Sequence, residues 1–185
     1  VLPNPVDTQA LLQTTVKTNM QHNPSALTLV CVGRMTEEKG HRDLIDAIAI
    51  AQANWPDSNP SLHIHMIGDG PLQAELELRA KKIREPHSVK FFGALSDVGT
   101  SIANADALIL PSLFEGMPNV VLEAMALETP VIATRAGGTI ELEREEQTIL
   151  WAEPQNAESL AAAILSFGTD PKSSVPRTQA ATRLI

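Results

Sequence analysis

The chain has 185 residues, 43% of them apolar, which suits one compact domain with an aliphatic core, since aromatic residues make up only 3%. Its net charge of −8 argues against broad nucleic-acid binding, which needs a basic surface, but does not exclude a small anionic ligand. The single cysteine, Cys31, excludes a disulfide within the chain and favours a reducing, cytosolic setting.

Short apolar runs predict the strands, and apolar residues with a period near 3.6 predict the helices between them. We expect six strands, at residues 28–33, 62–67, 89–92, 107–110, 131–133 and 149–152. We expect helices at residues 44–53, from Pro71 through Leu76 to Ile83, 96–104, 118–127 and 156–167. Residues 1–27 predict a linker with room for one short helix, and residues 169–185 show no clear period and predict a tail.

The alternation of strands and helices predicts one α/β domain over residues 28–168, with a doubly wound, Rossmann-like parallel sheet. The aliphatic runs suit strands that are buried on both faces. In such sheets ligands bind beyond the carboxyl ends of the strands. The loops that we expect at those ends are 33–40, 68–71, 93–96, 111–118 and 135–139.

Two cations occupy the first of these loops. Arg34 follows Gly33 directly, and Lys39 precedes Gly40. A guanidinium offers a planar fork for phosphate oxygens, and an ammonium offers a compact positive charge. The loop is therefore a candidate phosphate site. The alternative is a solvated loop in which Lys39 simply lies beside the acidic residues 37–38.

The fourth loop leads into a predicted helix with Pro118 at its first position. Free N–H groups near a helix start, together with the helix dipole, favour an anion. Gly116 lets a ligand approach the backbone closely. This segment therefore predicts a second element of an anion site.

Two glutamates flank the predicted helix start. Glu115 precedes it, and Glu123 falls on the same helix face as Asn119, with its side chain leaning toward the helix N-terminus. The two carboxylates could therefore line one pocket. The alternatives are an ordinary loop acid at Glu115 and an ordinary surface acid at Glu123.

The remaining patterns are weaker or absent. The glycine pair at 137–138 allows either a close approach to the backbone or a tight turn. The Gly-Asp-Gly turn at 68–70 lacks the third glycine of a dinucleotide fingerprint, and no phosphate loop, Asp-x-Asp metal motif or catalytic triad occurs. His63 and His65 share a strand face, but no Cys or carboxylate partner in the sequence supports a metal site there.

Several of these pieces, in their order, resemble a known family. They are Val-Gly-Arg at 32–34, Lys-Gly at 39–40, Ile-Gly-Asp-Gly-Pro at 67–71, Phe-Phe-Gly at 91–93, Ala-Asp-Ala-Leu-Ile-Leu-Pro-Ser at 105–112, Glu-x7-Glu at 115–123 and Pro-Val-Ile-Ala-Thr at 130–134. The chain resembles the carboxyl-terminal, donor-binding domain of the group 1 retaining glycosyltransferases, which have the two-domain GT-B fold. The resemblance covers residues 28–168, and the segment at 3–7 resembles the family's interdomain segment.

The resemblance implies a donor-binding set and three catalytic candidates within it. The donor-binding set is Gly33, Arg34, Lys39, Leu95, Glu115, Gly116, Met117, Pro118, Asn119, Val120 and Glu123, and the catalytic candidates are Glu115, Arg34 and Lys39. The two cations would bind the donor diphosphate and stabilise negative charge as the bond to phosphate breaks, a task shared by the N–H groups at 116–120. Glu115 would orient the sugar, Glu123 would bind the ribose, and the loop at 93–95 would line the base.

The family also implies retention of the anomeric configuration, with a nucleotide-sugar donor such as a UDP-sugar and no metal cofactor. Both a double displacement through Glu115 and a same-face attack stay open. The acceptor, a saccharide or a lipid-linked one, would be bound by an amino-terminal domain that this chain lacks. We therefore expect the chain, which starts at Val1 without an initiator methionine, to be a piece of a longer protein that binds donor but transfers little alone.

Three other functions fit the fold class. The Glu-x7-Glu segment disfavours one half of a nucleotide-sugar epimerase. The intact cations and glutamates disfavour a non-catalytic nucleotide-binding module. The missing third glycine of the dinucleotide fingerprint disfavours a nicotinamide-binding domain. Residues 139–146 are more charged than the family pattern and lack its glycine, so its sugar-end contacts are not carried over there. No apolar run reaches membrane-spanning length. We expect a cytoplasmic protein of polysaccharide biosynthesis, with contact of the full protein to the inner membrane face left open.

Overall fold

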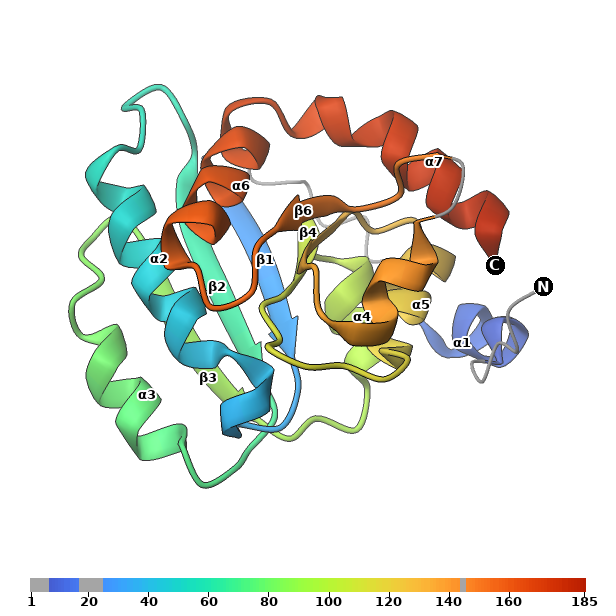
Figure 1. The fold of residues 1–185 in the computed structure, drawn as a ribbon, viewed down its shortest axis with the longest axis horizontal. Helices are drawn as coiled ribbons and strands as arrows, with labels where there is room; N and C mark the ends of the chain where they lie inside the picture. Colours follow the sequence, from blue (N-terminus) through green and yellow to red (C-terminus); the bar gives the residue numbers. More distant parts are fainter. Residues whose placement is uncertain (1–6, 17–24, 144–145) are drawn as a thin grey trace.

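The computed structural model describes residues 7–16, 25–143 and 146–185, and its centre is a six-stranded parallel sheet in the order β3-β2-β1-β4-β5-β6 (Figure 1). The strands are β1 (Ala26–Val32), β2 (Ser61–Ile67), β3 (Ser88–Gly93), β4 (Ala107–Leu110), β5 (Val131–Thr134) and β6 (Leu150–Ala152). The α-helices are α1 (Thr8–Thr14), α2 (His41–Ala53), α3 (Gln73–Ala80), α4 (Val98–Ala103), α5 (Asn119–Ala126), α6 (Ala157–Thr169) and α7 (Val175–Leu184). The short 3-10 helices are η1 (Glu37–Lys39), η2 (Gly137–Leu142) and η3 (Pro171–Ser174). The predicted doubly wound α/β fold with six strands is confirmed.

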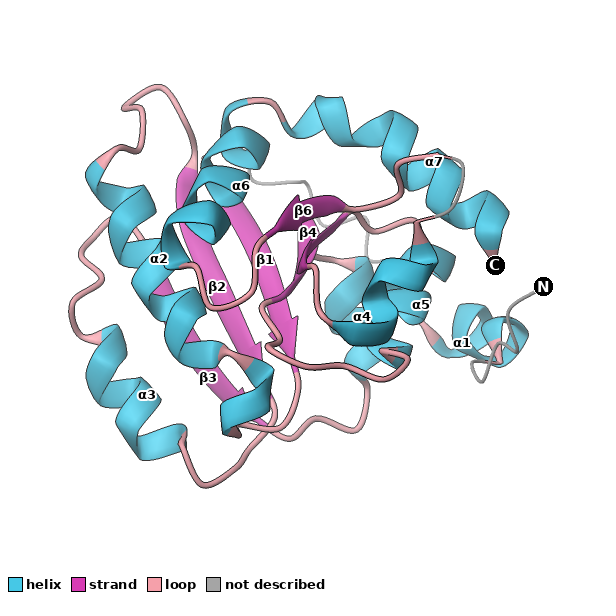
Figure 2. Ribbon diagram, in the orientation of Figure 1, coloured by secondary structure: helices cyan, strands magenta, loops and turns pink. Residues whose placement is uncertain are grey.

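Helices cover both faces of the sheet, and Figure 2 shows α2 and α6 in front of β1 and β2. The core on that face includes residues of α2, α3 and α6, whereas the core on the other face includes residues of α4, α5 and α7. The winding reverses between β1 and β4, because β2 and β3 lie on one side of them and β5 and β6 on the other. This reversal is the place where doubly wound sheets bind ligands. We call the loops at 33–40 and 111–118, which follow β1 and β4, the switch point.

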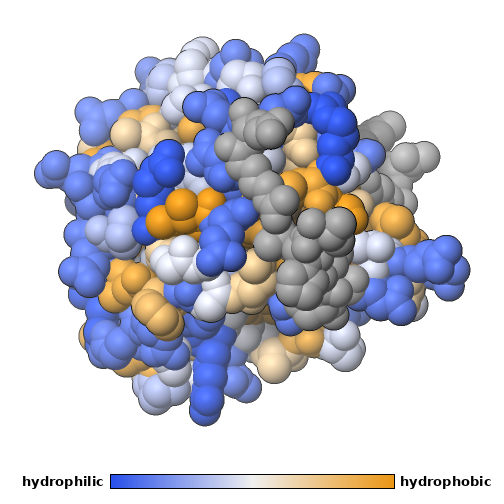
Figure 3. Space-filling model, turned by 45° about the vertical axis from the view of Figure 1, so that its right-hand side comes forward, coloured by the Kyte–Doolittle hydropathy of each residue, from blue (hydrophilic) through white to orange (hydrophobic). Residues whose placement is uncertain are grey.

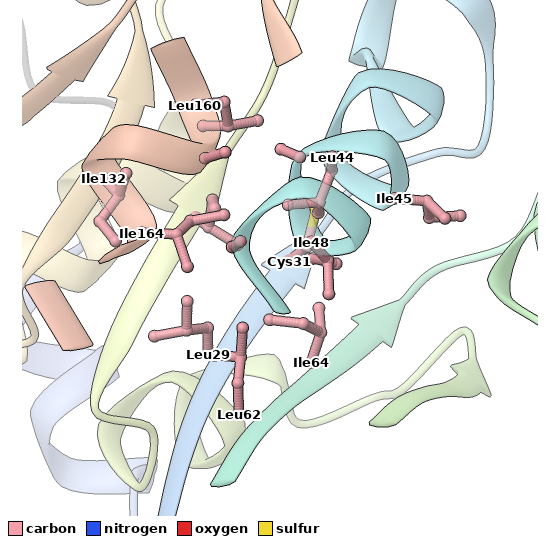
Figure 4. Packing of buried hydrophobic residues seen from close by; sticks show 14 of the residues in the cluster. Leu29, Cys31, Leu44, Ile45, Ile48, Leu62, Ile64, Ile132, Leu160 and Ile164 are labelled. Carbon is pink, nitrogen blue, oxygen red and sulfur yellow. The ribbon is translucent and has the colours of Figure 1, made fainter. Parts of the chain in front are cut away.

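The two cores follow from the alternation of side chains along each strand. In β1, Leu29 and Cys31 pack under α2, whereas Val30 packs under α5. Figure 4 shows Cys31 beside Leu44 and Ile48 of α2, which recur at a spacing of four residues. Burying one such aliphatic side chain contributes about 1.5–3 kcal/mol. Burial also raises the pKa of the Cys31 thiol to about 12, so the thiol stays protonated.

Two prolines do not begin helices as the sequence analysis expected. Pro118 is the N-cap of α5, with an extended ψ of 100°, and the helix begins one residue later. Pro71 lies in a turn, and α3 begins at Gln73 after the N-cap Leu72 and ends before Ile83. The helix thus begins one residue after Pro118 and two residues after Pro71.

The segment after Thr169 differs from the irregular tail expected from the sequence, since it forms η3 and α7. Ala181 of α7 is buried in the core beneath α5, and the Thr182 hydroxyl donates to the Met125 carbonyl oxygen at 3.4 Å. Small residues on the buried face give α7 a weak apolar period, so the pattern was not visible in the sequence. The expected short helix before the domain is α1, while residues 1–6 and 17–24 of the predicted linker lie outside the described residues.

None of the helices that the structure describes is long and apolar enough to cross a membrane. On the face drawn in Figure 3, hydrophobic residues lie in small groups among hydrophilic ones.

Candidate functional site

The two loops of the switch point are packed directly against each other. Gly40 ends η1 and precedes α2 with a φ of +63°, a conformation that favours glycine. A Cβ atom at Gly40 would lie 2.0 Å from the carbonyl oxygen of Pro111, so a side chain there would separate the loops. The Leu113 N–H donates to the Glu38 carbonyl oxygen at 2.8 Å. The backbone therefore holds the ends of β1 and β4 together.

This packing brings Lys39 and Glu115 into contact. The Lys39 ammonium donates to Glu115 Oε1 at 2.7 Å, and the Ser112 hydroxyl donates to the same oxygen at 2.6 Å. Glu115 is only 8% exposed. The alternative in which Lys39 lies beside its acidic neighbours does not describe the structure, because Glu37 pairs with Arg42 and the Glu38 carboxylate accepts from a threonine. Sequence reasoning singled out both partners but did not predict the ion pair.

Arg34 lies in the same loop but is exposed, and within the described residues its guanidinium makes no ion pair or hydrogen bond. Two backbone hydrogen bonds to the end of β2 and the turn after it fix the turn that carries Arg34. The Gly33 N–H donates to the Ile67 carbonyl oxygen at 3.0 Å, and the Met35 N–H donates to the Asp69 carbonyl oxygen at 2.7 Å. The Gly-Asp-Gly segment at 68–70 thus supports this turn through its backbone. A fixed turn with a free guanidinium suits the binding of an anion from solution.

The start of α5 lies directly after Glu115. The first helical hydrogen bond runs from the Val121 N–H to the Pro118 carbonyl oxygen at 3.0 Å. In the described chain, no acceptor is recorded for the backbone N–H groups that precede it, those of Gly116, Met117, Asn119 and Val120. Unpaired N–H groups at a helix start carry partial positive charge. Together with the neighbouring cations, they make this end of the sheet suitable for a phosphate group.

Glu123 lies one turn further along α5 and is partly buried. Burial raises the pKa of its carboxyl above the ordinary value of 4.5, because no cation offsets the loss of hydration. Within the described residues the carboxylate of Glu123 makes no recorded hydrogen bond or ion pair. A partly buried carboxylate without a partner is available to accept hydrogen bonds from a polar ligand.

The glycine pair at 137–138 packs against the chain itself. A Cβ atom at Gly137 would lie 1.9 Å from the Glu115 carbonyl oxygen, and one at Gly138 would lie 1.9 Å from that of Gly116. The Gly138 N–H also donates to the Glu115 carbonyl oxygen at 3.0 Å. The close approach that the glycines allow is therefore to the 115–116 backbone, which they support from the neighbouring strand end.

Leu95, in the loop after β3, is 39% exposed, and Phe92 beside it is 45% exposed. The sequence analysis gave no role to Phe114, which is 70% exposed in the loop from β4 to α5. It also gave no role to Ser112, although a hydroxyl three residues before Glu115 at a strand end was a usable signal. Leu95, Phe92 and Phe114 are thus exposed apolar side chains in or near loops at the carboxyl ends of the strands.

His63 and His65, the two histidines of β2, have other neighbours among the described residues. Both ring nitrogens of His63 are within hydrogen-bond distance of serines, 2.8 Å from Ser61 and 2.7 Å from Ser88, and the His65 ring lies 4.7 Å from that of Phe92. Among the described residues, no group of three or more His, Cys, Asp or Glu side chains could hold a metal ion.

Comparison with known proteins decides the family. The model of the family described as "Glycosyl transferases group 1" matches residues 14–183. The chain belongs to the group 1 glycosyl transferases. The resemblance seen in the sequence is therefore confirmed, and the match extends through most of α7, the helix that the sequence analysis missed.

Curated relatives in this glycosyl transferase family include enzymes of polysaccharide synthesis. The chain is 37% identical over 138 residues to a putative teichuronic acid biosynthesis glycosyltransferase, TuaC, of Bacillus subtilis, covering 75% of this chain and 32% of the relative. It is 33% identical over 155 residues to a glycogen synthase of Mycobacterium tuberculosis, covering 83% of this chain and 36% of the relative. The chain thus spans about a third of the length of these relatives.

Solved structures of glycosyltransferases share the fold. The C-terminal domain of LpcC, a group 1 family protein from Francisella tularensis, has a TM-score of 0.79 at 24% identity, with 97% of this chain and 95% of that domain covered. Anabaena HepE, solved in complex with UDP and glucose, has a TM-score of 0.75 at 25% identity, with 86% of this chain and 43% of HepE covered. The LpcC match thus shows that nearly the whole chain shares the fold of one such domain.

Proposed function

We propose that this chain is the donor-binding half of a retaining glycosyltransferase, which transfers a hexose from a nucleoside-diphosphate sugar to a saccharide or lipid-linked acceptor. One observation carries the proposal: Lys39 and Glu115 meet beside the unpaired N–H groups at the start of α5. A cation and open N–H groups suit a diphosphate, and a fixed carboxylate suits sugar hydroxyls. The binding of UDP and glucose by HepE supports a UDP-sugar as the donor.

Each group then has a place along an extended donor. Arg34 and Lys39 bind the diphosphate, together with the N–H groups at 116–120. Glu115 accepts hydrogen bonds from the sugar, and Glu123 accepts them from the ribose hydroxyls. Leu95 and the backbone of its loop line the base. No protein group in this arrangement requires a metal ion, because the cations and N–H groups neutralise the diphosphate.

In the transition state of sugar transfer, negative charge develops on the leaving diphosphate. As the bond between the anomeric carbon and the diphosphate oxygen breaks, negative charge grows on the leaving oxygen, and Lys39 and Arg34 stabilise it more than they stabilise the ground state. Glu115 Oε1 accepts two hydrogen bonds, whereas Oε2 has no recorded partner within the described residues and is open toward a donor. This arrangement is compatible both with same-face attack, in which the leaving phosphate accepts the acceptor proton, and with a covalent glycosyl-Glu115 intermediate.

Calorimetry and thermal unfolding test the donor site. We expect one of UDP, GDP and ADP, but not NAD, to bind, and a ligand at about a hundred times its dissociation constant to add about 2.7 kcal/mol of stability. Arg34→Ala should weaken the binding, whereas Arg84→Ala should not. Both arginines are exposed, but Arg84 lies just before β3, at the opposite end of the sheet. Stabilisation by NAD alone would overturn the proposal.

A second measurement addresses the missing acceptor-binding domain. We expect the isolated chain to bind donor but to transfer sugar at a negligible rate, and the full-length protein to be active. Membrane association of the full protein, measured by vesicle sedimentation, is expected to depend on the part outside this chain. Sugar transfer by the isolated chain at a rate of about 1 per second or more, within the usual enzyme range, would contradict this part of the proposal.

A further inference from the structure

A buried hydroxyl contacts the Glu115 carboxylate. Ser112 follows β4, is 0% exposed, and donates its hydroxyl hydrogen to Glu115 Oε1 at 2.6 Å. Lys39 donates to the same oxygen at 2.7 Å. Within the described residues no hydrogen bond is recorded to Glu115 Oε2. One oxygen of this carboxylate is therefore held by the protein, and the other is available to a ligand.

Ser112 is itself held from the neighbouring strand. Thr134, the last residue of β5, is 3% exposed, and its hydroxyl donates to the Ser112 carbonyl oxygen. The Gly138 N–H, four residues further along, donates to the Glu115 carbonyl oxygen at 3.0 Å. The end of β5 thus holds both residues of the Ser112–Glu115 pair, one through a side chain and one through the backbone.

The position of the serine matters because a carboxylate side chain has several torsions of similar energy. Lys39 alone would not select one of them, since an ammonium on a flexible stem follows the carboxylate as it moves. Ser112 is short, buried and fixed to two strands, so its hydroxyl defines one place for Oε1. A fixed Oε1 also fixes the direction of Oε2.

We propose that Ser112, supported by Thr134, is a positioning residue that orients the Glu115 carboxylate for the hydroxyls of the donor sugar. The inference rests on the proposed function of Glu115. If Ser112 has this role, it contributes to the preference of the site for a nucleotide sugar over the nucleoside diphosphate without a sugar. The serine itself touches Glu115 and not the ligand.

The test compares two ligands by calorimetry on the isolated chain: the nucleoside diphosphate that binds best, and its glucose ester. We expect Ser112→Ala to weaken binding of the glucose ester about tenfold, as for loss of one well-oriented hydrogen bond to a charged group, and to change binding of the diphosphate less than about twofold. A residue with only a structural role would weaken both ligands alike.

A double-mutant cycle shows whether the serine acts through the glutamate. In a Glu115→Ala background, we expect Ser112→Ala to have no further effect on binding of the glucose ester, because the side chain that the serine orients is then absent. Additive effects would overturn the inference.

Thr134 at the end of β5 and Thr129 just before its start provide a second route in case Ser112→Ala fails to fold. Thr134→Val removes the hydroxyl that holds Ser112 and should reduce the preference for the glucose ester. Thr129→Val is the matched control, because Thr129 is also buried and donates to a carbonyl oxygen, that of Ile102, but lies just before the other end of β5. Equal effects of the two threonine changes would also overturn the inference.

The outcomes separate the two proposals. If the wild type binds none of the diphosphates or their glucose esters, the proposed function fails, and the inference fails with it. If the wild type prefers the glucose ester and both Ser112→Ala and Thr134→Val keep that preference, the proposed function stands and only the role of Ser112 is wrong.

Discussion

Two regions of the molecule carry several charged side chains: the surface formed by helices α2 and α3, and the switch point. On the α2–α3 surface charged side chains neutralise one another in ion pairs, whereas at the switch point this pairing is incomplete. On the α2–α3 surface, Asp46 accepts from Arg79 and from Lys82, and Arg42 pairs with two glutamates. These pairs are solvated, so they contribute little stability, and they leave little charge for a partner.

At the switch point the charges are arranged differently. Arg34 has no partner in the described structure, and Glu123 is partly buried without one. Lys39 and Glu115 pair with each other, but Glu115 is nearly inaccessible and is also held by a buried hydroxyl. The comparison teaches that a functional edge is marked by charges that the fold leaves unpaired or holds in one orientation, and not by the number of charges.

The largest expected effect comes from breaking the backbone packing at the switch point. Gly138→Ala should lower the free energy of unfolding by about 3 kcal/mol, because its Cβ atom would lie 1.9 Å from a carbonyl oxygen and the backbone must move. Urea denaturation measures this. Gly116→Ala is the control, since its Cβ atom would meet nothing within 4 Å. Equal losses in the two variants would contradict the packing described here.

A buried histidine, His41, follows the loop at 33–40. We expect it to make the free energy of unfolding of the chain depend on pH, and the solvated ion pairs of the α2–α3 surface to contribute less. Burial lowers the pKa of His41 to about 4, with a further contribution from Lys39, whereas the unfolded value is near 6.5. The unfolded chain therefore binds a proton that the folded chain does not, and this stability is lost as the pH falls from 6.5 toward 4.

We expect His41→Leu to reduce the acid-induced loss of the free energy of unfolding by about 3 kcal/mol at pH 4. Urea denaturation between pH 6.5 and pH 4 measures this. The His41 side chain is 2% exposed and its Nδ1 has no hydrogen-bond partner in the described structure. Parallel pH profiles of the variant and the wild type would show that His41 does not resist protonation.

A pair of lysines tests the comparison through binding. Lys39→Met should weaken binding of the preferred nucleoside diphosphate about thirtyfold, which corresponds to about 2 kcal/mol for a charged hydrogen bond. Lys82→Met, on the α2–α3 surface, should change it less than about twofold, because Lys82 is paired with Asp46 at a distance from the site. Similar losses in both variants would mean that net charge, and not the switch point, determines affinity.

The smallest expected effect is on the α2–α3 surface itself. Arg79→Ala should lower the free energy of unfolding by less than about 1 kcal/mol, and the difference should shrink in high salt, because the pair with Asp46 is screened by solvent. A loss that is large and independent of salt would show that this surface stabilises the fold.

Most of the fold could be predicted because its signals are local. The run at Ala107–Leu110 is buried on both faces, so it is apolar throughout and is recognised as a strand without any knowledge of its neighbours. By contrast, α7 buries small residues such as Ala180 and Ala181, which carry almost no periodic signal. Its existence depends on the surface of α5, against which it packs.

The sequence by itself determined the sheet, the loops at its carboxyl edge and the residue types suited to a phosphate, because each depends on neighbours within a few positions. Only the tertiary structure decided that Lys39 meets Glu115, 76 residues away, that Ser112 and Gly138 hold that glutamate, and that Arg34 is left unpaired. The physical reason is that these contacts arise where loops from different strands converge, and their partners are set by the order of strands in the sheet.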